Sequence, residues 1–164
     1  YGSIPILYEQ WSLSVEIKPT GTVEGTYSNV LHVGLGGDKA VYGDRIPGIW
    51  FVDGSTKQSF SYFVNLSKTS ILYHNLLVQN FASAAILNSG SKLYISSAIS
   101  GSSDHSTTTE PIPMNEWTKL DITQFRISDG SYRFQISVGG NIVSQIINRD
   151  PRRFRNLKVG SLQY

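Results

Sequence analysis

Two aspartates border a glycine-containing segment in the first third of the chain and could supply oxygen ligands to a metal ion. Asp38 closes the segment GLGGD, and Asp44 begins the segment DRIPGIWF. Calcium takes about six to eight oxygen ligands and accepts loop carbonyls as well as carboxylates. We therefore predict that calcium, if the protein binds it, is held by Asp38 and Asp44. Asp53 and backbone carbonyls are further candidate ligands.

The same segment also has a structural interpretation. Asp44 and Arg45 can pair with each other or with their neighbours, while Pro47 and Gly48 favour a turn. Trp50 belongs to the apolar run IWFV and is then expected in the core. On this interpretation the segment is a corner at the rim of the fold, where Arg45 is a candidate ligand-binding residue.

Basic residues gather near the C-terminal end of the chain. The segment NRDPRRFRNLKV contains Arg149, Arg152, Arg153, Arg155 and Lys158. An arginine fork binds sulfate or carboxylate through two parallel hydrogen bonds. Arg152, Arg153 and Arg155 are therefore candidate contacts for a sulfated polysaccharide. The alternative is a solvated edge strand, whose charges oppose edge-to-edge aggregation.

Aromatic side chains are the second kind of candidate for sugar binding, because a pyranose ring presents its C–H groups to an aromatic face. Tyr27 and Tyr42 lie in or near expected loops and are the candidates. A tyrosine at a rim can also face water without any function. Trp11, Trp50 and Trp117 are instead expected in the core.

No arrangement of residues typical of an active site is present, and we expect the protein not to be an enzyme. A retaining glycosidase needs two carboxyl groups about 5–5.5 Å apart. Glu9 and Glu16 lack a suitable spacing, and two prolines separate Glu110 from Glu116. The three histidines share no zinc-ligand spacing, and no G-x-S-x-G segment accompanies the serines. His32 is expected to be a packed or hydrogen-bonded residue.

The composition indicates one domain rich in strands. The 164 residues suffice for a single hydrophobic core, and we expect one domain over residues 1–164. A formal charge of +2 gives no strong field towards nucleic acid, and no apolar run is long enough to span a membrane. Without cysteine the chain can form neither disulfides nor thiolate metal sites.

Alternating segments specify the elements that must position these candidates. In WSLSVEI and YRFQISV, apolar and polar residues alternate with the period of a half-buried strand. The turn GGN after Val138 predicts a hairpin, and SDG at 128–130 marks another turn. Further expected strands are Asn29–Leu35, Gly48–Val52, Leu93–Ser97, Thr118–Thr123, Ile142–Ile147 and Leu157–Val159. We predict an all-β, two-sheet antiparallel sandwich or barrel.

The order of several motifs resembles a module of extracellular proteins from marine invertebrates. The motifs are IPILYEQWSLSVEIKPTGTVEGTYSNVLHV, YGDRIPGIWFVDGST, KLYISSAISG, PIPMNEWTKLDITQ, DGSYRFQISVGG and FRNLKV. The module belongs to the concanavalin A-like, laminin G-like jelly rolls, and the resemblance implies a two-sheet sandwich that binds glycans or matrix proteins. Related modules often carry a cysteine pair where this chain has Ser96 and Ser106. They also tend to have a longer tail than GSLQY.

The segment at about 57–90 interrupts this resemblance and is predicted to be an insertion. It is apolar and aromatic without a clean period. Because so many apolar groups cannot remain in water, we expect the insert to add strands or a flap over one sheet and to contribute to self-association. Asn65 lies in an N-glycosylation pattern, Asn-Leu-Ser.

Together these observations predict an extracellular, non-catalytic, lectin-like module that binds a glycan or sulfated polysaccharide. Neither a nucleic-acid partner nor a membrane span is expected. A structural or self-assembly module of a matrix or fibre is the first alternative, and a polysaccharide-cleaving enzyme is the weaker one.

Overall fold

The computed structural model describes residues 2–19, 27–37, 43–52, 59–60, 64–66, 85–86, 92–97 and 105–160. Within these ranges the regular elements are all strands. They are β1 (Gly2–Leu7), β2 (Trp11–Ile17), β3 (Tyr27–Gly34), β4 (Gly48–Val52), β5 (Ser59–Phe60), β6 (Val64–Leu66), β7 (Ala85–Ile86), β8 (Lys92–Ser97), β9 (His105–Thr108), β10 (Thr118–Arg126), β11 (Tyr132–Val138), β12 (Asn141–Asn148) and β13 (Phe154–Gly160). The described part of the chain contains no helix long and apolar enough to cross a membrane.

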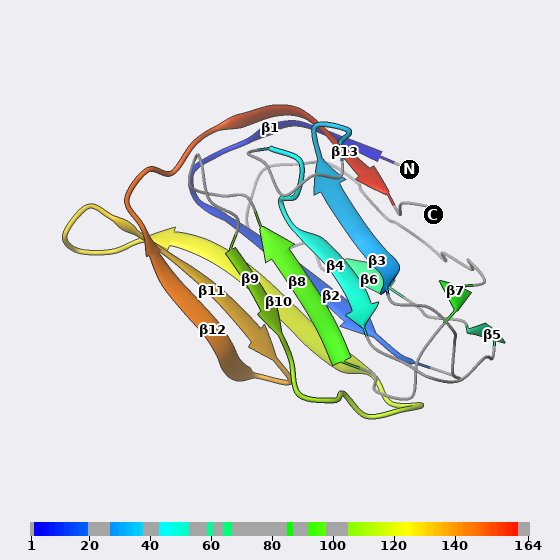
Figure 1. Ribbon diagram of the computed structural model, residues 1–164. Helices are drawn as coiled ribbons and strands as arrows, with labels where there is room; N and C mark the ends of the chain where they lie inside the picture. Colours follow the sequence, from blue (N-terminus) through cyan, green and yellow to red (C-terminus); the bar gives the residue numbers. More distant parts are fainter. Residues whose placement is uncertain are drawn as a thin grey trace.

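The strands form two antiparallel sheets and a short ribbon (Figure 1). Sheet A has the order β1-β13-β3-β4-β8-β9, and sheet B has the order β12-β11-β10-β2-β6. β5 pairs with β7 in the ribbon. The two sheets pack face to face, and the prediction of an all-β, two-sheet antiparallel jelly-roll sandwich is confirmed.

The core lies between the inner faces of the two sheets. Sheet A contributes Leu31, Ile49, Phe51, Leu93 and Ile95, and sheet B contributes Val15, Ile17, Leu120, Ile122, Phe134 and Ile136. Removing one such side chain from water stabilises the fold by about 1.5–3 kcal/mol. Alternate residues of the same strands point away from the core, so each sheet also presents an outer face.

Both alternating segments fold as predicted. In β2, Trp11, Val15 and Ile17 are buried, and in β11 the buried apolar residues are Phe134 and Ile136. Trp117, in contrast, is 50% exposed, so its expected place in the core is wrong. It stands one residue before the buried Thr118 that begins the inward-facing series of β10, and therefore has the opposite parity.

The two predicted turns are also confirmed. Gly139 and Gly140 connect β11 to β12 with φ values of 57° and 85°, which an L side chain rarely adopts. At the turn 128–130, the Ser131 hydroxyl and backbone N–H both donate to Asp129 Oδ1, at 2.5 and 2.9 Å. These hydrogen bonds lower the pKa of Asp129.

The basic segment before the C-terminus does not form an edge strand. β13 lies inside sheet A, between β1 and β3, because β1 pairs along its outer side. Its charged residues are compatible with this central position, since Phe154, Leu157 and Val159 enter the core while Arg155 and Lys158 remain exposed. Among the described strands, the edges of sheet A are β1 and β9.

Parts of the predicted insert lie within the described residues. β6 adds a strand to sheet B by pairing with β2, where Asn65 stands opposite Glu16. The ribbon joins Ser59–Phe60 to Ala85–Ile86 in antiparallel register, so positions near the two ends of the insert are neighbours. This agrees with an excursion that leaves the sandwich and returns beside its own start. The remaining residues of 57–90 lie outside the described residues.

Candidate functional site

A group of polar and aromatic side chains gathers on the outer face of sheet A. The strand registers place Trp50 opposite Tyr94, Gly48 opposite Ser96 and His32 opposite Gly48. Their chain neighbours Leu31, Ile49, Phe51 and Ile95 enter the core, so these residues face outward. We name Asn29, His32, Arg45, Trp50, Tyr94 and Ser96 the Arg45 cluster.

Arg45 is the centre of this cluster. Its guanidinium carbon lies 4.8 Å from the centroid of the Trp50 ring, which is the geometry of a cation–π contact. Its Nη1 donates a 3.2 Å hydrogen bond to Ser96 Oγ. Arg45 is half-buried, so the indole and the serine hold the guanidinium in one orientation while part of its surface stays accessible.

Trp50 is buried, as its apolar neighbours suggested, but it lies on the outer face and not between the sheets. Only 3% of the residue is exposed. Its ring centroid lies 5.8 Å from that of Tyr94 and 6.4 Å from that of His32. Its expected place in the core is therefore corrected: it forms the floor beneath Arg45.

Gly48 explains how an indole can lie flat against its own strand. A Cβ atom at this position would overlap the six-membered ring of Trp50. The glycine two residues before the tryptophan thus gives the ring its place above the backbone. Pro47 and Gly48 were interpreted as a turn signal, and Gly48 also provides the space for the Trp50 ring.

The loop that carries Arg45 is bound to the end of β3. Val33 N–H donates to Pro47 O, Leu35 N–H donates to Gly43 O, and Ile46 N–H donates to Val33 O. These backbone hydrogen bonds fix the position of Arg45 relative to His32 and Trp50. The segment is therefore a structural corner, as one of the two sequence interpretations proposed, and the corner also builds the site.

The aspartates predicted to bind calcium are only partly described. Asp44 is half-buried, and its carboxylate lies against Gly37, where a Cβ would come within 2.5 Å of Oδ2. Asp38 and Asp53 lie outside the described residues. Among the residues that the structure describes, no three His, Cys, Asp or Glu side chains form a group able to hold a metal ion.

Calcium binding thus stays a prediction. The melting temperature, measured with calcium and with a chelator, provides its test. A ligand that binds only the native state raises the melting temperature. If Asp38 and Asp44 hold calcium, the melting temperature should rise with calcium in the wild-type protein and not in Asp44→Asn. Equal melting temperatures of the wild-type protein with calcium and with a chelator would end this proposal.

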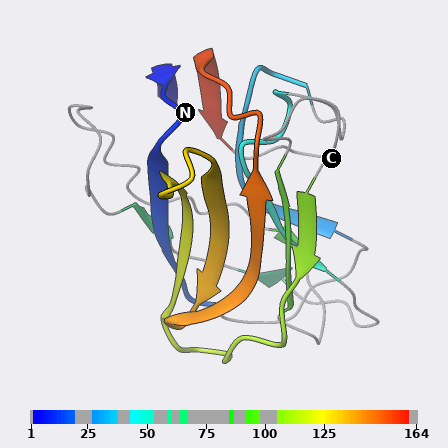
Figure 2. The same cartoon turned by 90° about the vertical axis from the view of Figure 1, so that its left-hand side faces the viewer.

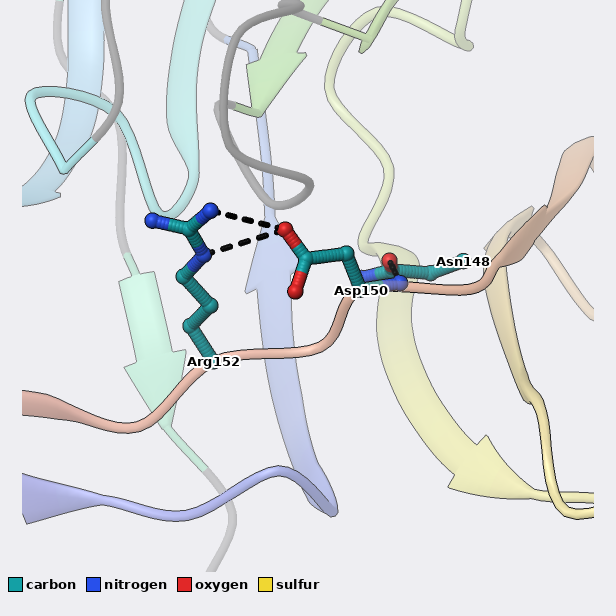
Figure 3. Close-up of polar contacts among 3 residues, drawn as sticks. All are labelled: Asn148, Asp150 and Arg152. Atoms are coloured by element: carbon teal, nitrogen blue, oxygen red, sulfur yellow. Dashed lines mark hydrogen bonds and ion pairs between the residues drawn. The ribbon is translucent and has the colours of Figure 1, made fainter.

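The C-terminal arginines do not join the Arg45 cluster as one patch. Arg152 Nε and Nη2 donate to Asp150 Oδ2 at 3.1 and 2.8 Å (Figure 3). The segment is anchored by the buried Asn148, whose Oδ1 accepts from Asp150 N–H. Arg153 pairs with Glu9 at 3.3 Å and stacks on Tyr8 at 4.8 Å.

These contacts change the assignment of the predicted arginine site. Arg152 and Arg153 form a rim next to the turn after β1, with acidic partners of their own. Exposed ion pairs of this kind contribute about 0–1 kcal/mol to stability. Arg155, in contrast, is exposed on β13, the strand next to the β3–β4 pair that carries the Arg45 cluster.

The side chains of the two predicted tyrosines lie outside the described part of the structure, and one tyrosine of the cluster was missed. Tyr27 begins β3, where its backbone pairs with Val52, and Tyr42 lies outside the described residues. Tyr94 is the tyrosine that joins the cluster. The alternation in KLYISS, with Leu93 and Ile95 facing inward, was the available signal for an outward Tyr94 and Ser96.

The charge of sheet A distinguishes it from sheet B. None of its six strands contains Asp or Glu, while Lys92, Arg155 and Lys158 are basic. Sheet B carries both signs, including the 3.0 Å pair of Lys119 with Asp121. The described strands of sheet A therefore contain no acidic residue, and the acid next to Arg45 in the chain, Asp44, belongs to the loop before β4.

Comparisons with known proteins yield only distant likenesses. No protein-family model and no curated protein matches the chain. The solved structure of the alginate lyase from Alteromonas sp. 272 is 12% identical, with a TM-score of 0.42, over 90% of this chain and 52% of that one. Sheep galectin-11 in complex with glycerol is 14% identical, with a TM-score of 0.38, over 98% of this chain and 95% of that one.

The chain spans about half the length of the alginate lyase. Neither likeness is close enough to transfer a site or an activity. The strand orders and registers themselves define the protein as a two-sheet antiparallel jelly-roll sandwich.

Proposed function

We propose that the protein is an extracellular, non-catalytic carbohydrate-binding module whose site is the outer face of sheet A around Arg45. The observation that carries the proposal is the guanidinium of Arg45, stacked on Trp50 and hydrogen-bonded to Ser96. Arginine presents a planar fork of donors that matches carboxylate and sulfate. Tyr94, half-buried beside Trp50, adds an aromatic surface of the kind that packs against sugar C–H groups.

An anionic polysaccharide is the favoured class of ligand. The six strands of sheet A carry no acidic residue, so an anionic chain crossing this face meets no like charge from them. Arg155 and Lys158 add two exposed basic residues on β13, the strand next to β3 in the same sheet. Binding should weaken as salt rises, because charges exposed to water are screened over about 8 Å at physiological ionic strength.

A glycan array of neutral, carboxylated and sulfated saccharides tests this function. We expect weak binding, with dissociation constants of about micromolar to millimolar, concentrated among the anionic saccharides. Running the array with calcium and with a chelator also separates a metal-dependent site from a metal-independent one. A blank array in both conditions, from protein shown to be folded, would contradict the proposal.

Cleavage of a polysaccharide is the alternative activity, and it can be tested with the saccharides that the protein binds. His32 and Tyr94 both flank Trp50, so the cluster contains groups able to exchange protons. His32 is, however, only 5% exposed, which is unfavourable for contact with a substrate. We expect no new reducing or unsaturated ends after prolonged incubation with the bound polysaccharide. Their appearance would show that the protein is an enzyme and would contradict the proposal of a non-catalytic module.

A further inference from the structure

β12 has a surface that the carbohydrate site does not use. It is the last strand of sheet B, and within the described chain its only strand partner is β11 (Figure 2, orange). An open edge strand exposes backbone N–H and C=O groups, which proteins usually protect with charges or proline. The sequence of β12, NIVSQIIN, contains neither.

The other described edges are protected in ways that β12 is not. β1 contains Pro5, which removes a backbone donor at the edge of sheet A. β9 is short and polar, with the sequence HSTT, and β6 has only three residues. β12 is eight residues long, and its Ile142, Val143 and Ile147 are 56%, 40% and 41% exposed. Of the described edges, it is the one best suited to pair with another strand.

β12 is also held firmly enough to act as a template. β11 pairs with β12 along the whole of β12. The register shifts once, between Ile136 and Ser137 of β11, so that Val143 is an extra residue in β12. From sheet A, His105 Nε2 forms a 3.0 Å hydrogen bond with Ser144 Oγ, and the His105 ring packs edge-on against Phe134 at 5.6 Å. Ser144 thus faces the interior, whereas Gln145 is exposed.

We propose that β12 pairs with the β12 strand of a second copy of this chain, antiparallel, about a two-fold axis at Gln145. An edge strand is self-complementary in this arrangement, because a two-fold axis presents the same donors and acceptors in reverse order. Centring on Gln145 places the exposed Val143 of one copy opposite the exposed Ile147 of the other, and Ser144 opposite Ile146.

The absence of charged residues in β12 favours a second copy of this strand over a charged partner. Since β12 has no charged residue, its own copy brings no like-charge pair into the junction. In the dimer, Val143 and Ile147 on the two sides of Gln145 cover each other, and sheet B continues from one copy into the next. This dimer is independent of the carbohydrate site, which lies on the other sheet.

Sedimentation velocity of the full chain tests the dimer. We expect a concentration-dependent monomer–dimer equilibrium, which Ile147→Lys weakens by about tenfold or more, because a charge then enters the apolar junction. The matched control is Leu35→Lys, which places the same charge on an apolar residue that is 48% exposed away from β12. A parent that remains monomeric, or a folded Ile147→Lys that dimerises like the parent, overturns the proposal.

A single cysteine tests the register without disturbing the strand. The chain has no cysteine, so Gln145→Cys creates one thiol that meets its own copy at the two-fold axis. Mild oxidation should yield a disulfide-linked dimer of Gln145→Cys at much lower concentration than of Ser3→Cys, the control on the exposed edge strand β1. Equal cross-linking of the two variants overturns the proposal, and this result decides it even if Ile147→Lys does not fold.

Discussion

Replacing Phe134 with alanine is expected to lower the free energy of unfolding by about 3–5 kcal/mol, which is a large share of the stability of a domain. Phe134 is fully buried in β11, with its ring 6.0 Å from Trp11 and 5.6 Å from His105. The deletion removes both ring contacts and leaves a cavity between the sheets. Urea denaturation followed by fluorescence measures the loss.

Phe125→Ala is the matched control for this prediction. Phe125 lies on the outer face of the same sheet, in β10, and is 38% exposed. The same substitution there should cost about 1 kcal/mol or less, because most surface changes have small effects. Similar losses for the two variants would contradict the assignment of inner and outer faces in sheet B. If Phe134→Ala does not fold at all, Phe134→Leu provides a smaller measurable loss.

Gly48→Ala is expected to destabilise the protein by about 1–3 kcal/mol and to weaken binding at the Arg45 cluster. A loss of stability is the opposite of the usual effect, because glycine inside a strand ordinarily makes a protein about 0.5–1 kcal/mol less stable than alanine does. Here the added Cβ overlaps the Trp50 ring, which is buried and has to move. When the indole moves, Arg45 loses the surface that orients it.

A double-mutant cycle separates the ring overlap from other effects of Gly48→Ala. In a Trp50→Leu background the large ring is absent, so the alanine should be neutral or stabilising. Melting curves of the two single variants and the double variant give the coupling energy. The same loss from Gly48→Ala in both backgrounds would show that Trp50 does not lie over Gly48.

Alternation predicted strands well where a sheet has one buried face and one exposed face. β2 and β11 lie inside sheet B, and their sequences alternate because only one side meets the core. The GGN turn fixed the β11–β12 pairing in the same local way. These features depend on residues close together in the chain, so the sequence contains the required information.

Strands without such a pattern were missed. β1 includes Pro5, which argues against a central strand but is acceptable at an edge. β9 contains no apolar residue, and its strand character comes from pairing with β8. Such elements are specified by their neighbours in space. No periodicity in their own few residues could have identified them.

The candidate site was predictable in part. Arg45 was identified from its segment, and its contact with the indole of Trp50 required knowledge of the parity of β4. The run IWFV is apolar on both faces, so the sequence does not show that Ile49 and Phe51 enter the core while Trp50 faces outward. That choice follows from the pairing of β4 with β3 and β8, which also brings Tyr94 and Ser96 to Arg45.

The most direct measurement of the central claim is a calorimetric titration with the anionic oligosaccharide that binds best on the array. It compares the wild-type protein, Arg45→Met and Arg126→Met. Methionine keeps the length of the arginine stem and removes the fork, and Arg126 is an exposed arginine at the end of β10 in sheet B. All three proteins should retain the same circular dichroism spectrum.

We expect the wild-type protein and Arg126→Met to bind equally and Arg45→Met to bind about tenfold or more weakly, a loss of about 1.4 kcal/mol or more. This loss follows from removing a charge-assisted bidentate contact that Trp50 and Ser96 hold in place. Equal affinities of the wild-type protein and folded Arg45→Met would contradict the claim that the outer face of sheet A is the carbohydrate-binding site.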